Sequence, residues 1–268
     1  MRINIKDKSV CLNCKRKTCA MSDVVERVIF TRFKTERYTC PVRYLQTEPE
    51  DSQIDAGRID LTQGSESGLH CIHCGLCVLQ CANDNLEIVN EGDDNFRSFI
   101  DCSCAQNVGV ANILATSFLN VLFDFAANTN LSKALLFDGI VCDQNGRYAY
   151  VEVDEGDDSL ESCRRLLGDI VQHNYKNPEI KIHIGLMVLK SIPRAGNRDV
   201  VTLTEKMRKF PGTANIDIFV ITFDILRTLC LKFDKNRLKF EDVFYNLSRE
   251  EYSQYVTRMN SLGILVEG

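Results

Sequence analysis

The order of apolar and polar positions predicts regular secondary structure in the last 160 or so residues of the chain. Apolar periods of 3.6 residues indicate amphipathic helices, and short continuous apolar runs indicate buried strands. Helices are predicted at residues 110–125, 158–173 and 203–209, and strands at residues 133–142, 147–154, 181–189 and 216–226. This order predicts an α/β domain with a mixed sheet over residues 106–230.

A turn at Asp143–Gly146 separates two of these strands, because Asn-Gly is a strong hairpin signal. Two loops fit the sequence. A two-residue loop would pair Asp138 with Val153 and leave Asp138 and Glu152 on opposite faces of the sheet. A three-residue loop over residues 144–146, with its glycine left-handed, would pair Asp138 with Glu152 on the same face.

The rest of the chain has weaker patterns. An insertion rich in Asp, Glu, Gly and Ser at residues 46–68 is expected on the surface, and residues 86–89 predict a short strand. We place a domain boundary near residue 105. Residues 231–268 predict a small helical or winged-helix-like tail with two short helices and a final strand at residues 263–266.

Composition narrows the classes of function. The net charge of −5 argues against nucleic-acid binding by bulk electrostatics alone. Residues 1–45 are basic, either to offset the charge of metal-bound thiolates or to touch a phosphate backbone. The apolar stretch 108–127 contains Asn112, Asn120 and Asp124, so it predicts a buried helix rather than a membrane span. With no signal peptide apparent, we expect a cytoplasmic protein without a membrane partner.

Cysteines carry the most specific motif. The run Cys71-x2-Cys74-x2-Cys77-x3-Cys81 has the spacing with which thiolates hold a [4Fe–4S] cluster. A second set lies upstream: Cys11, Cys14, Cys19 and Cys40, the last followed by proline. The spacing fits metal chemistry better than disulfides. Zinc bound by the upstream set is the alternative to a second cluster.

The first hundred residues resemble the bacterial two-cluster ferredoxins, in which the last cysteine of each run ligates the other cluster. The resemblance implies an α+β ferredoxin-like domain at residues 1–105 with two [4Fe–4S] clusters. One cluster would be held by Cys11, Cys14, Cys19 and Cys81, and the other by Cys71, Cys74, Cys77 and Cys40. Cys102 and Cys104 are substitute ligands or small buried residues. We expect the remaining cysteines to lie in the core: Cys142, Cys163 and Cys230.

Carboxylates interrupt two of the apolar strands. Asp138 lies inside the run 135–141, and Glu152 and Asp154 lie near the end of the following strand. Glu152 and Asp154 share one face, because strand side chains alternate. A charge in such a strand is costly unless it is paired or binds a metal. The alternative is that this acidic segment only caps the next helix.

The element order and these acids resemble the PD-(D/E)xK fold of restriction endonucleases. The resemblance implies that Asp138 and Glu152 bind Mg²⁺ and that Asp138, Glu152 and Asp154 form the catalytic site. Asp154 stands where that family usually has lysine. Asp124 is a further candidate acid. Several cations would line a phosphate path or form a solvated face: Lys190, Arg194, Arg198, Lys206, Arg208 and Lys209.

Three functions follow from these resemblances. The first is an iron–sulfur protein with a Mg²⁺-dependent nuclease domain, from a prokaryotic restriction or antiviral defence system, with nucleic acid and partner proteins as its ligands. The second is an electron-transfer protein or subunit. The third is a non-catalytic iron–sulfur interaction protein with a degenerate nuclease fold.

Overall fold

The chain divides into two compact units, Met1–Leu114 and Ala115–Gly268. The computed structural model describes residues 2–7, 9–10, 13–14, 58–60, 74–90, 96–97, 100–101, 110–127, 137–156, 159–192, 198–207, 209–233 and 238–266. The boundary predicted near residue 105 lies outside the described residues.

The first unit contains a small antiparallel sheet and a short helix. The sheet has the strand order β2-β1-β3, with β1 at Arg2–Ile5, β2 at Arg58–Asp60 and β3 at Leu86–Asn90. Strand β3 confirms the predicted strand at residues 86–89. Strand β2 lies within the predicted surface insertion, so this part of the insertion belongs to the sheet. Helix α4, Leu76–Leu79, ends shortly before β3.

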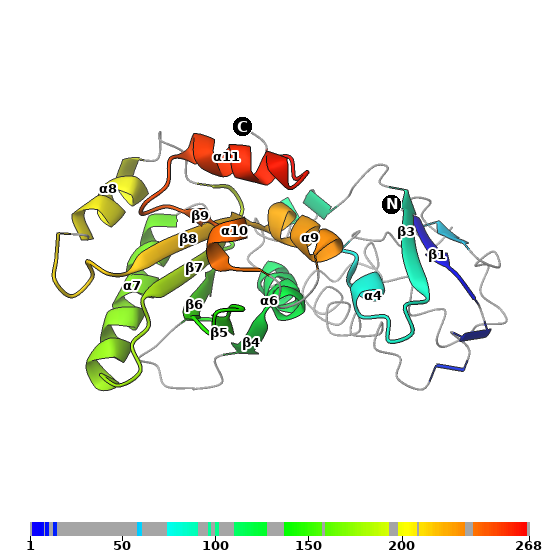
Figure 1. The fold of residues 1–268 in the computed structure, drawn as a ribbon, viewed down its shortest axis with the longest axis horizontal. Coiled ribbons are helices and arrows are strands. Elements are labelled where there is room, and N and C mark those ends of the chain that lie inside the picture. The colour runs from blue at the N-terminus through cyan, green and yellow to red at the C-terminus, as the bar shows by residue number, and fades with distance from the viewer. Residues whose placement is uncertain are drawn as a thin grey trace. The chain divides into compact units, whose positions relative to one another are not determined.

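A six-stranded mixed sheet forms the middle of the second unit, in the order β4-β5-β6-β7-β8-β9 (Figure 1). Strands β6, β7 and β8 are parallel, and the other neighbours are antiparallel. The predicted α/β domain with a mixed sheet is therefore confirmed. The strands are β4 Asp124–Ala127, β5 Gly139–Cys142, β6 Tyr148–Val153, β7 Ile184–Leu189, β8 Asp217–Thr222 and β9 Tyr245–Asn246.

Helices cover both faces of this sheet (Figure 1). They are α6 Val110–Leu122, α7 Ser159–Lys176, α8 Arg198–Met207, α9 Phe223–Lys232, α10 Phe240–Val243 and α11 Tyr252–Ser261. Helix α7 packs on β6, β7 and α8. On the other face, the ring of Phe240 in α10 lies 5.5 Å from that of Phe123 and 6.3 Å from that of Phe219 in β8. None of the helices in the described part of the chain combines the length and apolar character needed to cross a bilayer.

Three differences from the predicted elements have local causes. Helix α6 ends at Leu122, and the predicted end of this helix is instead strand β4. Strand β8 stops at Thr222, whose side chain accepts a hydrogen bond from the N–H of Ile225 at 3.4 Å and caps α9. The apolar run that predicted one long strand therefore contains a strand and a helix. The strand predicted at residues 263–266 is wrong, and the tail contributes β9 instead.

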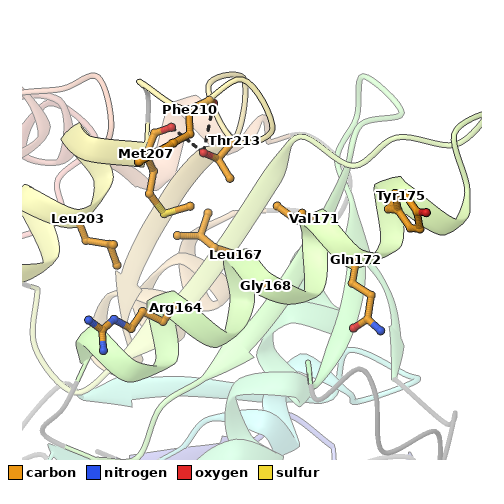
Figure 2. A pocket seen from close by; sticks show the side chains of 10 residues that line it. All are labelled: Arg164, Leu167, Gly168, Val171, Gln172, Tyr175, Leu203, Met207, Phe210 and Thr213. Atoms are coloured by element: carbon orange, nitrogen blue, oxygen red, sulfur yellow. Dashed lines mark hydrogen bonds between the residues drawn. The ribbon is translucent and has the colours of Figure 1, made fainter.

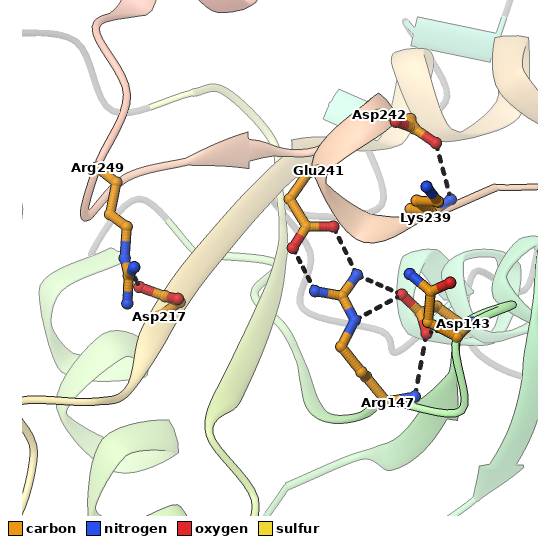
Figure 3. A network of polar contacts seen from close by, with 8 residues as sticks. Asp143, Arg147, Asp217, Lys239, Glu241, Asp242 and Arg249 are labelled. Atoms are coloured by element: carbon orange, nitrogen blue, oxygen red, sulfur yellow. Dashed lines mark hydrogen bonds and ion pairs between the residues drawn. The ribbon is translucent and has the colours of Figure 1, made fainter.

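The hairpin turn between β5 and β6 is tied to α10 by one arginine (Figure 3). The guanidinium of Arg147 bonds both Asp143 in the turn and Glu241 in α10. The hydrogen bond from Arg147 lowers the pKa of Glu241 below its ordinary value of 4.5. A second pair, Arg249 and Asp217 at 2.6 Å, joins the segment after β9 to β8. The contacts of Arg147 therefore tie the β5–β6 hairpin to α10, and the Arg249–Asp217 pair ties the segment after β9 to β8.

Candidate functional site

The β5–β6 hairpin brings Asp138, just before β5, to the end of β6 that carries Glu152. Gly139 pairs with Val151, Cys142 pairs with Tyr148, and the N–H of Asp143 bonds the carbonyl of Arg147 at 3.0 Å, which leaves a three-residue loop at residues 144–146. The last residue of that loop is Gly146, with a left-handed φ of 72°. The three-residue loop is thus confirmed, and Asp138 directly precedes Gly139, the first residue of this ladder.

The carboxylate of Asp138 sits at the end of the ladder between the two strands. Its Oδ2 accepts a hydrogen bond from the N–H of Val153 at 2.7 Å. Its own N–H donates to the carbonyl of Val151 at 2.8 Å. The side chain therefore supplies an acceptor that a strand carbonyl would otherwise provide, and this bond fixes the direction of the carboxylate.

Glu152 is the most buried of the three predicted acids, with 2% of the residue exposed. Its Oε1 forms an ion pair with the guanidinium of Arg165 from α7. Its Oε2 is buried and has no hydrogen-bond partner among the described residues. Burying a carboxylate with one unsatisfied oxygen costs free energy. A second cation or hydrogen-bond donor at Oε2 would offset this cost.

Asp154 continues the same face two residues beyond Glu152. Its N–H donates to the carbonyl of Val188 at 2.9 Å, and its Oδ1 accepts from the N–H of Gly156 at 2.8 Å. The side chain is buried, with 9% of the residue exposed. The three acids thus lie at the carboxyl end of the parallel strands, where open α/β sheets bind their ligands. Lys190 follows β7 at the same end.

Sequence reasoning missed Arg165, which forms an ion pair with one of these acids, Glu152. Helix α7 places Ser162, Arg165 and Asp169 in one row at spacings of three and four residues, and Ser162 and Asp169 are buried. The sequence signal for Arg165 is its position in this helical row, where a charged residue would face the sheet and need a partner of opposite charge. Arg165 thus brings a positive charge from α7 to Glu152.

Helix α7 is held against the sheet by a second polar group. The ring of Phe137 stacks on Tyr150 with 3.9 Å between centroids, and the N–H of Phe137 donates to Asp169 at 3.0 Å. His173 Nε2 lies 2.9 Å from the carbonyl of Ile180, so it donates, and Nδ1 accepts from the hydroxyl of Tyr150 at 2.5 Å. Burial, with a smaller contribution from Asp169, raises the pKa of Tyr150 to about 12.

An apolar groove lies between α7 and α8 and encloses about 660 Å³ (Figure 2). Its floor and rim include Leu167, Tyr175 and Met207, together with Arg164. Arg164 faces this groove, whereas its neighbour Arg165 pairs with Glu152. None of the predicted acids lines the groove, so it is separate from the acidic site.

Two other predictions about this unit need correction. Asp124 lies on β4 rather than on a helix and pairs with Cys142, at the end of β5 opposite to Asp138. It does not join the acidic site. Cys142 is only half-buried, whereas Cys163 and Cys230 lie in the core as predicted. Burial raises the pKa of the Cys163 thiol to about 12. The basic residues Arg194 and Arg208, and the acidic run at residues 157–158, lie outside the described residues.

Of the predicted cluster ligands, the described residues include Cys14, Cys74, Cys77 and Cys81. Gly75, between two of them, has a left-handed φ of 75°, which turns the chain into α4. Cys77 is buried on α4, and Cys81 follows the helix and accepts a hydrogen bond to Sγ from the N–H of Asn85 at 3.2 Å. The other candidates lie outside the described residues: Cys11, Cys19, Cys40, Cys71, Cys102 and Cys104.

Asn85 joins the beginning of the chain to the turn after Cys81. Its side chain accepts from the N–H of Asp7 at 2.9 Å and donates to the carbonyl of Asp7 at 2.7 Å. Its carbonyl accepts from the N–H of Lys6 at 3.0 Å. The segment that leads to Cys14 is therefore held beside the turn that follows Cys81.

Among the described residues, no three His, Cys, Asp or Glu side chains lie close enough together to hold a metal ion. At the acidic site, Glu152 has Arg165 as its counter-ion. Comparison of the chain with protein-family models, with curated proteins and with solved structures gives no match.

Proposed function

We propose that this chain is an iron–sulfur protein whose second unit is a Mg²⁺-dependent phosphodiesterase acting on nucleic acid. The observation that carries the proposal is the buried carboxylate of Glu152 near the end of β6, where Asp138 accepts a hydrogen bond from the N–H of the next residue, Val153. The order α6-β4-β5-β6-α7-β7, with a meander followed by a parallel crossover, agrees with the nuclease resemblance drawn from the sequence.

The donor set suits Mg²⁺. Mg²⁺ keeps several waters and is commonly held by one or two carboxylates together with phosphate oxygens of the substrate, so a cage of three protein ligands is not required. Glu152 offers Oε2, which has no partner among the described residues. Asp138 is fixed in direction by the N–H of Val153. Two oriented carboxylates at one strand end therefore fit such an ion.

The residues have distinct roles in this proposal. Bound Mg²⁺ would lower the pKa of a water and stabilise charge on the phosphate. Asp138 and Glu152 would hold it, and Asp154, on the same face as Glu152, would orient the attacking water. Lys190 and Arg165 would balance the negative charge of the substrate at this end of the sheet.

The first unit supports cluster binding through its described cysteines. The N–H of Asn85 donates to Cys81 Sγ, a bond that stabilises a thiolate and influences the potential of a cluster. Gly75 provides the left-handed turn between Cys74 and Cys77. These features fit two [4Fe–4S] clusters, with the ligand sets predicted from the sequence.

The nuclease activity is tested with the full chain purified without oxygen. The protein is incubated with Mg²⁺ or Mn²⁺ and with end-labelled single- and double-stranded DNA and RNA. Glu152→Gln should abolish cleavage. Glu161→Gln is the matched control, because Glu161 is an exposed acid on α7 that lies 3.8 Å from Arg164. Failure of the wild-type protein to cut all four substrates, or cutting that survives Glu152→Gln, refutes the activity.

Cluster content is tested separately by iron and sulfide analysis. Two clusters require about eight iron atoms per chain. Cys77→Ser should lower the iron content, whereas Cys230→Ser, which alters a core thiol of the second unit, should leave it unchanged. Zinc in place of iron in the wild-type protein would refute the assignment of both clusters.

Electron transfer is the second candidate, because the Asn85–Cys81 bond is of the kind that tunes a redox centre. It requires a cluster that is reduced and reoxidised reversibly at low potential. The nuclease proposal requires no such cycle, since its clusters would be structural. A cluster that resists reduction in a protein that cuts nucleic acid favours the first candidate. Membership of a restriction or antiviral defence system stays a prediction.

A further inference from the structure

We infer that Arg165 is a built-in counter-ion that occupies Glu152 until a divalent cation displaces it. This inference rests on the proposed metal site and concerns how that site is loaded. Arg165 would then be a positioning residue that competes with the metal, and its removal should strengthen metal binding rather than weaken it.

The two partners differ in their access to water, and this difference makes the exchange feasible. Glu152 is 2% exposed, whereas the side chain of Arg165 is 39% exposed. The guanidinium can leave toward solvent and be hydrated, while the carboxylate remains buried. A carboxylate left alone there would be costly, so an incoming cation must replace Arg165 as it departs.

The occupancy of the two Glu152 oxygens also fits an exchange. Oε1 faces Arg165, and Oε2 has no partner among the described residues. If Arg165 served only to stabilise the fold, a bidentate arrangement that satisfies both oxygens would be the stronger one. The observed arrangement leaves one oxygen for an arriving cation before Arg165 has moved.

The two neighbouring arginines of α7 provide a matched test. Arg164 is 61% exposed and lines the groove between α7 and α8, and its partner Glu161 is also on the surface. Mn²⁺ binding is measured on the full chain with its clusters intact, by the EPR signal of free Mn²⁺, for wild type, Arg165→Met, Arg164→Met and Glu152→Gln. Thermal unfolding is recorded for each protein with and without Mn²⁺.

Arg165→Met should bind Mn²⁺ about tenfold more tightly than wild type, since a pairing free energy of that order no longer opposes the metal. Without metal, its second unit should unfold about 5 °C lower, and Mn²⁺ should restore more of that loss than it adds to wild type. Arg164→Met should match wild type in both measurements. Glu152→Gln should bind no Mn²⁺ at this site.

The possible failures point to different conclusions. Equal or weaker Mn²⁺ binding by Arg165→Met, with wild type still binding through Glu152, overturns the inference and leaves the proposed metal site intact. Absence of Glu152-dependent binding in every variant overturns the metal site as well. If Arg165→Met does not fold, the double variant Glu152→Gln with Arg165→Met removes both charges. If the double variant folds and binds no Mn²⁺, the pairing of Arg165 with Glu152 is supported. If the double variant also fails to fold, that pairing is refuted as the cause.

Discussion

Asp138 accepts a hydrogen bond from the N–H of Val153, so the same carboxylate that is predicted to bind a metal also completes the β5–β6 ladder. Asp138→Ala should lower the free energy of unfolding by about 1–3 kcal/mol, because a strand N–H loses its acceptor. Asp138→Asn keeps an acceptor oxygen and should cost much less, while it still removes the charge that binds a metal. Chemical denaturation of both variants measures the difference, and equal losses would contradict this double role.

Gly146 provides the left-handed residue on which the hairpin register depends, with a φ of 72°. Gly146→Ala meets no neighbouring atom, so its cost is backbone strain alone, about 1 kcal/mol. Gly168→Ala is the control of opposite sign. Gly168 lies in α7 with open space around it, and alanine there should stabilise the helix by about 0.5–1 kcal/mol. Denaturation that shows the same sign for both variants would contradict the assigned turn.

Gly185 allows α7 to approach β7 closely. A Cβ at this position would lie 2.8 Å from side-chain atoms of Leu166 in α7 and of Ile218 in β8. Gly185→Ala should therefore push α7 outward and cost about 1–3 kcal/mol of stability. Because α7 also carries Arg165, this variant should weaken the Arg165–Glu152 pair. Unchanged unfolding together with unchanged Mn²⁺ affinity would show that α7 is less tightly coupled to the sheet than its packing indicates.

Glu241 gives the hairpin clamp a dependence on pH. The bond from Arg147 lowers the pKa of Glu241 below 4.5, so the folded state favours the ionised form. The stabilisation is present above about pH 4.5 and is lost as the pH falls through the lowered pKa. Glu241 is half-exposed, so Glu241→Gln should cost only about 1 kcal/mol at pH 7. Stability curves of the two proteins should converge in acid, and a constant gap would contradict the pairing.

Asn85 should control how firmly the first unit holds iron. Asn85→Ala removes both side-chain bonds to the backbone of Asp7, and we expect it to lose iron faster to a chelator than wild type. Lys6→Met is the control, because the side chain of Lys6 contacts the exposed turn at Asp84. Equal rates of iron release from the two variants would mean that the junction between Asn85 and Asp7 does not restrain the cysteines.

The sequence determined the class of the second unit but not the details that complete its site. Apolar runs identified β6, β7 and the hairpin turn, because buried strands and an Asn-Gly turn leave strong local signals. The sequence did not decide the register of the hairpin, because a two-residue loop and a three-residue loop are both compatible with residues Asp143–Gly146. The pairing of Gly139 with Val151 shows which loop is present. Arg165 could not be assigned, because its partner is distant in sequence and depends on how α7 packs.

Helix α9 shows a different reason for a wrong prediction. The apolar sequence runs without interruption from β8 into α9, so composition alone does not mark the junction. Thr222 marks it through its side-chain bond to the N–H of Ile225. A cap residue inside an apolar run is a weak signal until the ends of neighbouring strands are known.

The short strand β9 covers the edge of β8. Tyr245 and Asn246 pair with β8, Leu247 N–H bonds the carbonyl of Ile218, and Ser248 Oγ accepts from the N–H of Ile218. The segment thus occupies hydrogen-bonding groups of an apolar strand that would otherwise serve as a template for aggregation. A chain cut after Phe233 should precipitate on refolding even though every predicted catalytic acid is retained. The C-terminal segment would then be required to keep the folded protein from aggregating.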